Sequence, residues 1–165
     1  MILGLSVSTF TLVHVIISLI GIGSGLIVLY GMLTSHKPGA WTGLFLATTV
    51  LTSATGFLFD SPFGPARVVG IISLVLLAIA LFALYGQHLA GVWRPVYVVT
   101  ALMALYLNCL VGVTQAFQKL DFLRPLAPTQ SEPPFLIAQG ALLLLFVVIG
   151  LVALRGYHPE RAAAA

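Results

Sequence analysis

The chain has 165 residues, of which 60% are hydrophobic and only 7% are charged. Ordinary soluble domains carry about 25% charged residues, so this composition excludes a water-soluble globule and indicates a multi-pass membrane protein. The mean hydropathy of +1.13 agrees with that reading. Seven Lys and Arg against four Asp and Glu give a net charge of +3, which is too little positive charge to build a groove for phosphates. We therefore expect no nucleic-acid partner.

Five segments of the chain are long and apolar enough to cross a bilayer. A helix rises about 1.5 Å per residue and the hydrocarbon core is about 30 Å thick, so a span needs roughly 20 mostly apolar residues. The predicted spans are residues 9–33, 41–59, 68–89, 95–117 and 135–154. Helices are expected because lipid does not tolerate an open strand edge and the alternation of barrel strands is missing. The sequence thus predicts one domain over residues 1–165, an all-α integral membrane bundle of five transmembrane helices.

The segments between the spans have the composition of turns and loops. Residues 36–39 and 60–65 are rich in Pro and Gly, which favour turns. The connection 118–134 is longer and rich in proline, and Ser131 is expected to cap the last helix. The polar tail after Leu154 is expected to fray.

Two spans carry features that bear on helix packing. In the first, Gly21 and Gly25 form a G-x-x-x-G pattern, which allows another helix to approach closely. The second span is the most polar because it holds many threonines. We expect it to pack inside the bundle, where its hydroxyls can bond backbone carbonyls or neighbouring helices.

Five spans place the two termini on opposite faces of the membrane. Four basic residues fall on one face and three on the other, and both tryptophans, Trp41 and Trp93, fall near the first face, as an interfacial belt would. The tryptophans support this assignment of residues to faces, and the excess of one basic residue on the first face predicts the N-terminus outside and the C-terminus inside.

Polar side chains from four spans converge on one half of the bundle. His14, Thr55, Gln115 and Gln139 come to the same half by chain direction, with Asn108 nearer the middle. Ser18 follows His14 on the same helical face. An ionisable residue inside a span suggests function, and a few hydrogen-bonding groups in an apolar cleft suit a quinone head group or a small polar ligand. Hydrogen bonding between helices alone would give the same pattern.

A second histidine pair, His36 and His88, falls at the opposite interface. Two histidines at similar depth on different helices could hold haem or a metal ion. Both positions, one in a turn and one at a helix end, are also places where histidine is ordinarily hydrated. Without a carboxylate or cysteine ligand, the pair makes a poor zinc site.

Several classes of function lack the residues they need. The predicted spans contain no Asp or Glu, which argues against a proton- or sodium-coupled transporter that uses an intramembrane carboxylate. No serine elbow, H-E-x-x-H or P-loop pattern is found, so no catalytic residue is assigned. Cys109 is the only cysteine and lies in an apolar run, where we expect an inert thiol and no disulfide.

Four strings of the sequence carry a resemblance to known proteins. They are His14–Gly25, Trp41–Val50, His88–Arg94 and Leu126–Phe135. Together they resemble a family of small bacterial multi-pass membrane proteins that has no assigned function. The likeness covers most of the chain to about Leu154, whereas residues 60–65 look less like the family. It implies a location in a bacterial inner membrane and no site residue.

Three functions remain open from the sequence. The first is a non-enzymatic bundle in the lipid bilayer that forms a homo-oligomer or joins a larger membrane complex; the small-residue faces, the proline-rich loop and the missing reaction centre favour it. The second is a redox or ligand-binding protein that holds a quinone near His14 or a haem between His36 and His88. The third is a passive pore lined by threonines of the second span. Those threonines are Thr48, Thr52 and Thr55.

Overall fold

The computed structural model describes residues 1–36, 39–59 and 64–159, which form five long helices and no β-strand. The helices are α1 (Val7–Leu33), α2 (Ala40–Gly56), α3 (Pro65–Leu81), α4 (Trp93–Lys119) and α5 (Pro133–Gly156). A π-helical turn, Phe82–Gly86, continues α3, and a short 3-10 helix, Arg124–Leu126, lies before α5. Each predicted span coincides with one helix, so the all-helical prediction is confirmed. The predicted turns at 36–39 and 60–65 fall largely outside the described residues.

The helix starts follow from local chemistry. At the start of α1, the Ser6 hydroxyl oxygen accepts a hydrogen bond from the backbone N–H of Thr9 at 3.1 Å. α3 and α5 begin at proline, whose fixed φ suits the first turn and whose missing N–H is not needed there.

The cap of α5 differs from the prediction. Glu132, not Ser131, is the N-cap residue, because Pro133 and Pro134 set the start of the helix one residue later. The Glu132 carboxylate accepts hydrogen bonds from the Thr129 hydroxyl at 2.8 Å and from the backbone N–H of Thr129 and Ser131 at 3.1 Å each. Desolvation by itself would raise the pKa of the Glu132 carboxyl. The hydrogen bonds outweigh this effect, so the pKa of Glu132 is lowered.

Within the described residues, four helical segments are long and apolar enough to cross a membrane: α1, α3 with its π-helical turn, α4 and α5. α2 has 17 residues, which rise about 25 Å at 1.5 Å per residue. It is therefore at the short end of the range for a membrane span.

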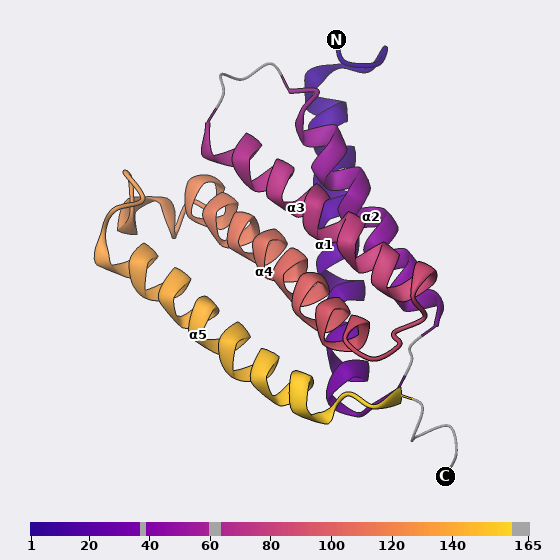
Figure 1. Ribbon diagram of the computed structural model, residues 1–165. Helices are drawn as coiled ribbons and strands as arrows, with labels where there is room; N and C mark the ends of the chain where they lie inside the picture. The colour runs from indigo at the N-terminus through magenta and orange to yellow at the C-terminus, as the bar shows by residue number, and fades with distance from the viewer. Residues whose placement is uncertain (37–38, 60–63, 160–165) are drawn as a thin grey trace.

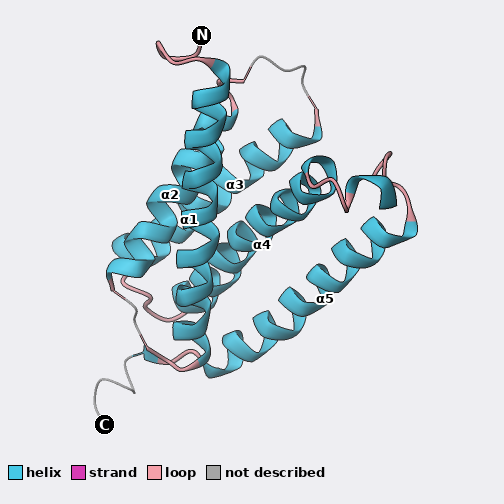
Figure 2. Cartoon of the chain, turned by 180° about the vertical axis from the view of Figure 1, so that it is seen from behind, coloured by secondary structure: helices cyan, strands magenta, loops and turns pink. Residues whose placement is uncertain are grey.

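The helices pack as an up-and-down bundle (Figures 1 and 2). α2 packs against α1 and α3, while α4 lies between α3 and α5 and also reaches α1. α1 begins at one end of the bundle and α5 ends at the other (Figure 1), as expected for an odd number of passes.

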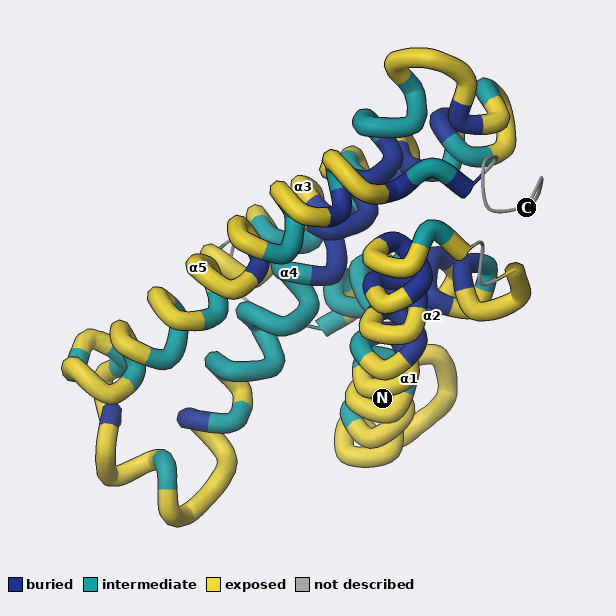
Figure 3. The backbone as a smooth tube through the Cα atoms, turned by 90° about the horizontal axis from the view of Figure 1, so that it is seen from below, coloured by how far each residue is buried: buried dark blue, intermediate teal, exposed yellow. Residues whose placement is uncertain are grey.

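The tightly packed core occupies only one half of the bundle. It is built from the second halves of α1, α3 and α5 and the first halves of α2 and α4, which meet at the same end. Its members are Val28, Leu29, Met32, Phe45, Leu46, Leu77, Ala80, Ala83, Leu89, Tyr97, Val98, Ala101, Leu102, Ala104, Leu105, Phe146, Ala153 and Tyr157. Exposed residues line the outward sides of the helices (Figure 3). The opposite half of the bundle is packed less closely.

The glycines of α1 permit the close contact that their spacing predicted. A methyl group built at Gly25 would lie 2.5 Å from Leu105 Cδ1 on α4 and 2.9 Å from Phe45 Cδ2 on α2. At Gly21 it would meet the Asn108 amide nitrogen at 3.2 Å and two threonine hydroxyls at 3.3 Å. α2 and α4 can therefore approach α1 only because these positions have no side chain.

Two threonine hydroxyls of the polar second helix bond backbone carbonyls, as predicted. The Thr48 hydroxyl donates to the carbonyl of Leu44 at 2.7 Å, and the Thr55 hydroxyl donates to the carbonyl of Leu51 at 2.6 Å. Its buried side is packed within the chain, while residues such as Leu51 remain exposed on the other side.

The prediction of a frayed tail after Leu154 is wrong for the residues that follow directly. α5 continues to Gly156, and Tyr157 is buried with its ring 6.4 Å from that of Tyr97. Arg94 Nη1 donates to the carbonyl of Tyr157 at 2.7 Å, and Ser35 Oγ donates to that of Gly156 at 2.6 Å. These bonds satisfy carbonyls that the helix end leaves without a partner, so they hold the segment in place. Residues 160–165 lie outside the described chain.

Candidate functional site

A cavity of about 530 Å³ lies in the half of the bundle opposite the core. We call it the His14 cavity. Its wall comes from α1 between Thr11 and Ile22, the end of α2 and the residues after it, the start of α3, and α4 from Leu107 to Lys119. Polar and apolar residues both line this half, whereas the closely packed apolar core lies at the other end. The volume lies within the range of about 300–1,000 Å³ that is usual for small-molecule sites.

His14 is held in one orientation by α2. Its Nδ1 lies 2.8 Å from the Thr55 hydroxyl oxygen. Because the Thr55 hydroxyl already donates its hydrogen to the Leu51 carbonyl, it must accept the bond from His14 Nδ1–H. The neutral ring then presents Nε2 as an acceptor. The Phe59 ring, whose centroid lies 5.2 Å away at an interplanar angle of 85°, packs against the imidazole edge to face.

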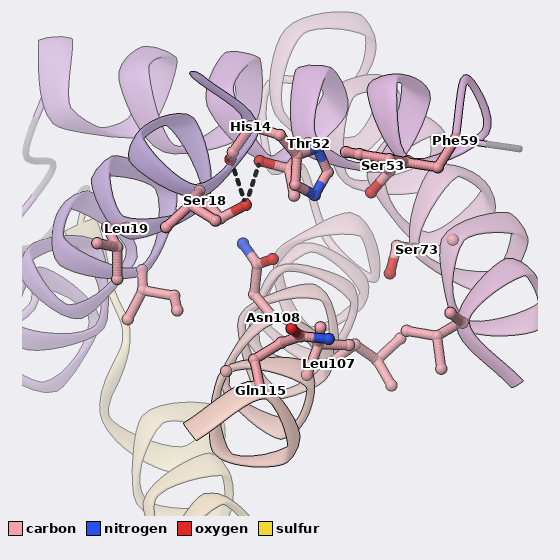
Figure 4. A pocket seen from close by; sticks show the side chains of 18 of the residues that line it. His14, Ser18, Leu19, Thr52, Ser53, Phe59, Ser73, Leu107, Asn108 and Gln115 are labelled. Atoms are coloured by element: carbon pink, nitrogen blue, oxygen red, sulfur yellow. Dashed lines mark hydrogen bonds between the residues drawn. The ribbon is translucent and has the colours of Figure 1, made fainter. Parts of the chain in front are cut away.

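Hydroxyl groups line the wall between α1 and α2. Ser18 Oγ donates to the His14 carbonyl at 2.8 Å and lies 3.3 Å from the Thr52 hydroxyl (Figure 4). Ser53 and Ser73 also line the cavity, from α2 and α3. Their residue types could hydrogen-bond a polar head group by donating or accepting.

Two amides from α4 face the hydroxyls across the cavity (Figure 4). Asn108 lies at the deeper position, and its amide nitrogen is 3.4 Å from the Thr49 hydroxyl, a long hydrogen bond. Gln115 lies two turns further along α4 and is exposed. In a low-dielectric setting an amide needs a partner, so these side chains favour a ligand with hydrogen-bonding groups.

Two basic residues complete the wall. Arg67 comes from the first turn of α3 and Lys119 from the last turn of α4. α3 and α4 run antiparallel and pack on each other, so both cations lie at the same end of the cavity. None of the acidic residues in the described part of the chain lines it.

The structure brings together four of the six residues that the sequence predicted for this site: His14, Ser18, Asn108 and Gln115. Thr55 lies behind His14 as its hydrogen-bond acceptor. Gln139 lies elsewhere: its Nε2 donates to the Leu110 carbonyl and to the Thr114 hydroxyl, each at 3.1 Å, on the side of α4 that faces α5. Gln139 therefore joins two helices and does not line the cavity.

The sequence did not predict Arg67 and Lys119 as site residues. Chain direction places Arg67 and Lys119 on the same face of the membrane, but it does not show that either side chain faces the polar pocket. The signal available in the sequence is weaker for Arg67 than for Lys119. Lys119 closely follows the fourth span, whose polar face belongs to the predicted pocket, whereas Arg67 precedes the third span, which contributes no residue to it.

The second predicted pair, His36 and His88, lies on the surface. Both side chains are exposed, and His36 Nδ1 bonds the nearby Thr34 carbonyl at 2.8 Å. Within the described residues, no group of three or more His, Cys, Asp or Glu side chains is arranged to hold a metal ion. Haem or a metal ion at this pair stays a prediction from the sequence.

The threonines proposed to line a pore do not share one surface. Thr52 lines the His14 cavity, whereas the Thr48 side chain is buried and the Thr55 hydroxyl is engaged by His14 and the backbone. The pore therefore stays a prediction from the sequence that the cavity does not support.

No family model matches this chain, and no curated protein or solved structure matches it either. The resemblance to small bacterial membrane proteins accordingly stays a prediction from the sequence.

Proposed function

We propose that the protein is an integral membrane protein that binds an amphipathic ligand in the His14 cavity. The cavity itself carries the proposal, because it combines a ligand-sized volume with hydrogen-bonding groups from four helices and an apolar wall. A binding role is favoured over catalysis because the sequence has no recognised catalytic motif. Of the ligand classes expected from the sequence, a quinone is amphipathic and would fit a site of this kind.

The surface of the bundle supports insertion in a bilayer. Large apolar side chains such as Ile137 and Leu144 on α5 are 69% and 65% exposed, and similar side chains cover the outward faces of α1 and α3. Soluble proteins rarely expose apolar patches of such extent, whereas lipid would cover them. We infer five crossings: four helical segments meet the length requirement, and the 17 residues of α2 meet its lower limit. A bacterial inner membrane, with the N-terminus outside, is the location we propose from the sequence.

The packing does not favour the first function considered from the sequence, a self-associating or accessory subunit. The glycine pattern that suggested an interface is used inside the chain, where Gly21 and Gly25 contact α2 and α4. Assembly with further copies or with a larger complex stays a prediction.

A pair of glycine substitutions tests the proposed function. Gly112 lines the cavity, and a Cβ there would meet only Ile22 Cδ1, at 3.5 Å, an ordinary contact. Gly112→Leu should therefore fill the cavity with little strain in the fold. Gly140→Leu is the matched control, because a Cβ there meets nothing within 4 Å and Gly140 does not line the cavity.

The measurement is organic extraction of protein purified in mild detergent from its membrane, with mass spectrometry of the extract and an absorbance spectrum of the sample. We expect one class of amphiphile to travel with the wild type and with Gly140→Leu, and to be depleted in Gly112→Leu. Equal amounts in all three proteins, or none above the detergent background, would contradict the proposal. A Soret band lost in His88→Ala would instead support the haem hypothesis.

A further inference from the structure

The charge on the cavity wall restricts the ligand further. Arg67 and Lys119 lie at one end of the cavity. Of the acidic residues in the described chain, Asp121 pairs with Arg124 at 3.4 Å and Glu132 binds its own loop. The described wall therefore holds two cations and no carboxylate. The remaining acidic residues, Asp60 and Glu160, lie outside the described residues.

The guanidinium group of Arg67 has N–H donors that could bind a ligand. Its Nη2 donates to the Phe59 carbonyl over a long distance of 3.4 Å. Its Nε is buried and has no acceptor within the described chain. A buried donor without a partner is unfavourable, and the fork of guanidinium N–H groups matches the two oxygens of a carboxylate or phosphate.

The charged groups lie at one end of the cavity, while apolar side chains occur along its whole length. Lys119 and Asn108 are eleven residues apart on α4, which corresponds to about 16 Å of helix rise. Between and beyond them the wall includes the apolar side chains of Leu19, Leu107 and Val111. A molecule with a charged head and an apolar tail would match a cavity that has its cations at one end and apolar side chains along its wall.

We propose that the ligand of the His14 cavity is an anionic amphiphile, whose carboxylate or phosphate head is bound by Arg67 and Lys119 and whose apolar tail lies along α1 and α4. This inference rests on the proposed function and names the class of ligand. The inference distinguishes this ligand from a neutral quinone, because a quinone has no anionic head group to pair with the two cations.

Two ligands of equal chain length and different charge test the inference. The full chain is placed in phosphatidylcholine nanodiscs, and binding of radiolabelled oleate and oleyl alcohol is measured above that of empty nanodiscs. We expect oleate to bind at least about tenfold more tightly, a difference of about 1.4 kcal/mol. Arg67→Gln and Lys119→Gln should each weaken oleate binding and leave binding of the alcohol unchanged. Arg124→Gln, a cation at the same end but outside the cavity, should have no effect.

The outcomes separate this inference from the proposed function. If oleate and the alcohol bind equally, Arg67→Gln changes neither, and Gly112→Leu blocks both, the cavity binds amphiphiles without regard to charge and the inference is overturned. If Gly112→Leu leaves oleate binding intact, the ligand lies outside the cavity and the proposed function fails too.

Competitors identify the source of the anionic head. Displacement of oleate by dodecyl phosphate shows that a phosphate head serves as well as a carboxylate, and failure to displace restricts the ligand to carboxylates. Displacement by acetate or inorganic phosphate at similar concentrations would show a site for small anions and would overturn the requirement for a tail.

Asp60→Asn checks whether Asp60 acts as a counter-ion: tighter oleate binding would support the inference, whereas loss of oleate binding would contradict it.

Discussion

Gly25 of α1 offers a direct test of how the bundle is held together. In Gly25→Ala, the new methyl group would lie 2.5 Å from Leu105 Cδ1 and 2.9 Å from Phe45 Cδ2. Carbon atoms pack best at about 3.5–4.0 Å, so these neighbours must retreat by about 1 Å and about 0.6 Å. Leu105 and Phe45 are each only 1% exposed, and they have no empty space to move into without displacing other core side chains.

The expected penalty follows from a matched pair of substitutions. Overpacking a well-packed core costs about 1–3 kcal/mol, whereas replacing a helical glycine with alanine gains up to about 1 kcal/mol from backbone propensity. Gly23 lies in the same helix, and a Cβ there meets nothing within 4 Å. The propensity gain is common to both variants and cancels. Gly25→Ala should therefore be about 1–3 kcal/mol less stable than Gly23→Ala.

Equilibrium unfolding in mixed micelles, followed by the fluorescence of Trp41 and Trp93, measures this difference. A second measurement adds Leu105→Ala, which removes the methyl group in closest conflict. In that background the penalty at Gly25 should shrink, giving a favourable coupling energy of the kind seen for residues in contact. If Gly25→Ala is as stable as Gly23→Ala, α1 does not depend on glycine for its contact with α2 and α4, and the packing argument is refuted.

Three further predictions concern the ends of the bundle and the α4–α5 contact. Arg94→Gln removes the charged hydrogen bond to the Tyr157 carbonyl and should speed amide exchange at the end of α5 by about tenfold; exchange no faster than in Arg155→Gln would contradict this. The Glu132 carboxylate has a folded pKa below its ordinary value of 4.5, so its contribution to stability is complete above about pH 4.5 and is lost as the pH falls through the lowered pKa. A pH titration of the Thr129 amide signal should show a midpoint below 4.5, and a midpoint at or above that value would exclude the cap. Gln139→Leu loses two hydrogen bonds from Nε2 but also removes a buried Oε1 that has no partner within the described chain, so the free energy of unfolding should change by less than about 1 kcal/mol. A loss of more than about 2 kcal/mol would show that this amide holds α5 in place.

Much of the fold was predictable because apolar runs and proline positions act locally. The five helices coincide with the predicted spans within a few residues, except that α2 and α3 end earlier. The Gly21 and Gly25 spacing also predicted close packing, since residues four apart share one face of a helix. These features depend on neighbouring residues in the sequence, which is why no tertiary information was needed.

The composition of the site was only partly predictable. Chain direction gives the depth of a residue in the bundle, and that placed His14, Ser18, Asn108 and Gln115 together. It does not give the neighbours that a helix face meets. Gln139 lies in the same half as His14 but faces Leu110 and Thr114 on the far side of α4.

The sequence by itself determined that this is an all-helical apolar chain with a polar face on its first and fourth helices. Only the tertiary structure decided that one half of the bundle is filled by bulky side chains while the other leaves a cavity, and that Arg67 and Lys119 close one end of it. Both results depend on the order in which helices neighbour each other and on their rotation about their axes. Those are set by long-range packing between side chains, which a periodic pattern along one helix does not contain.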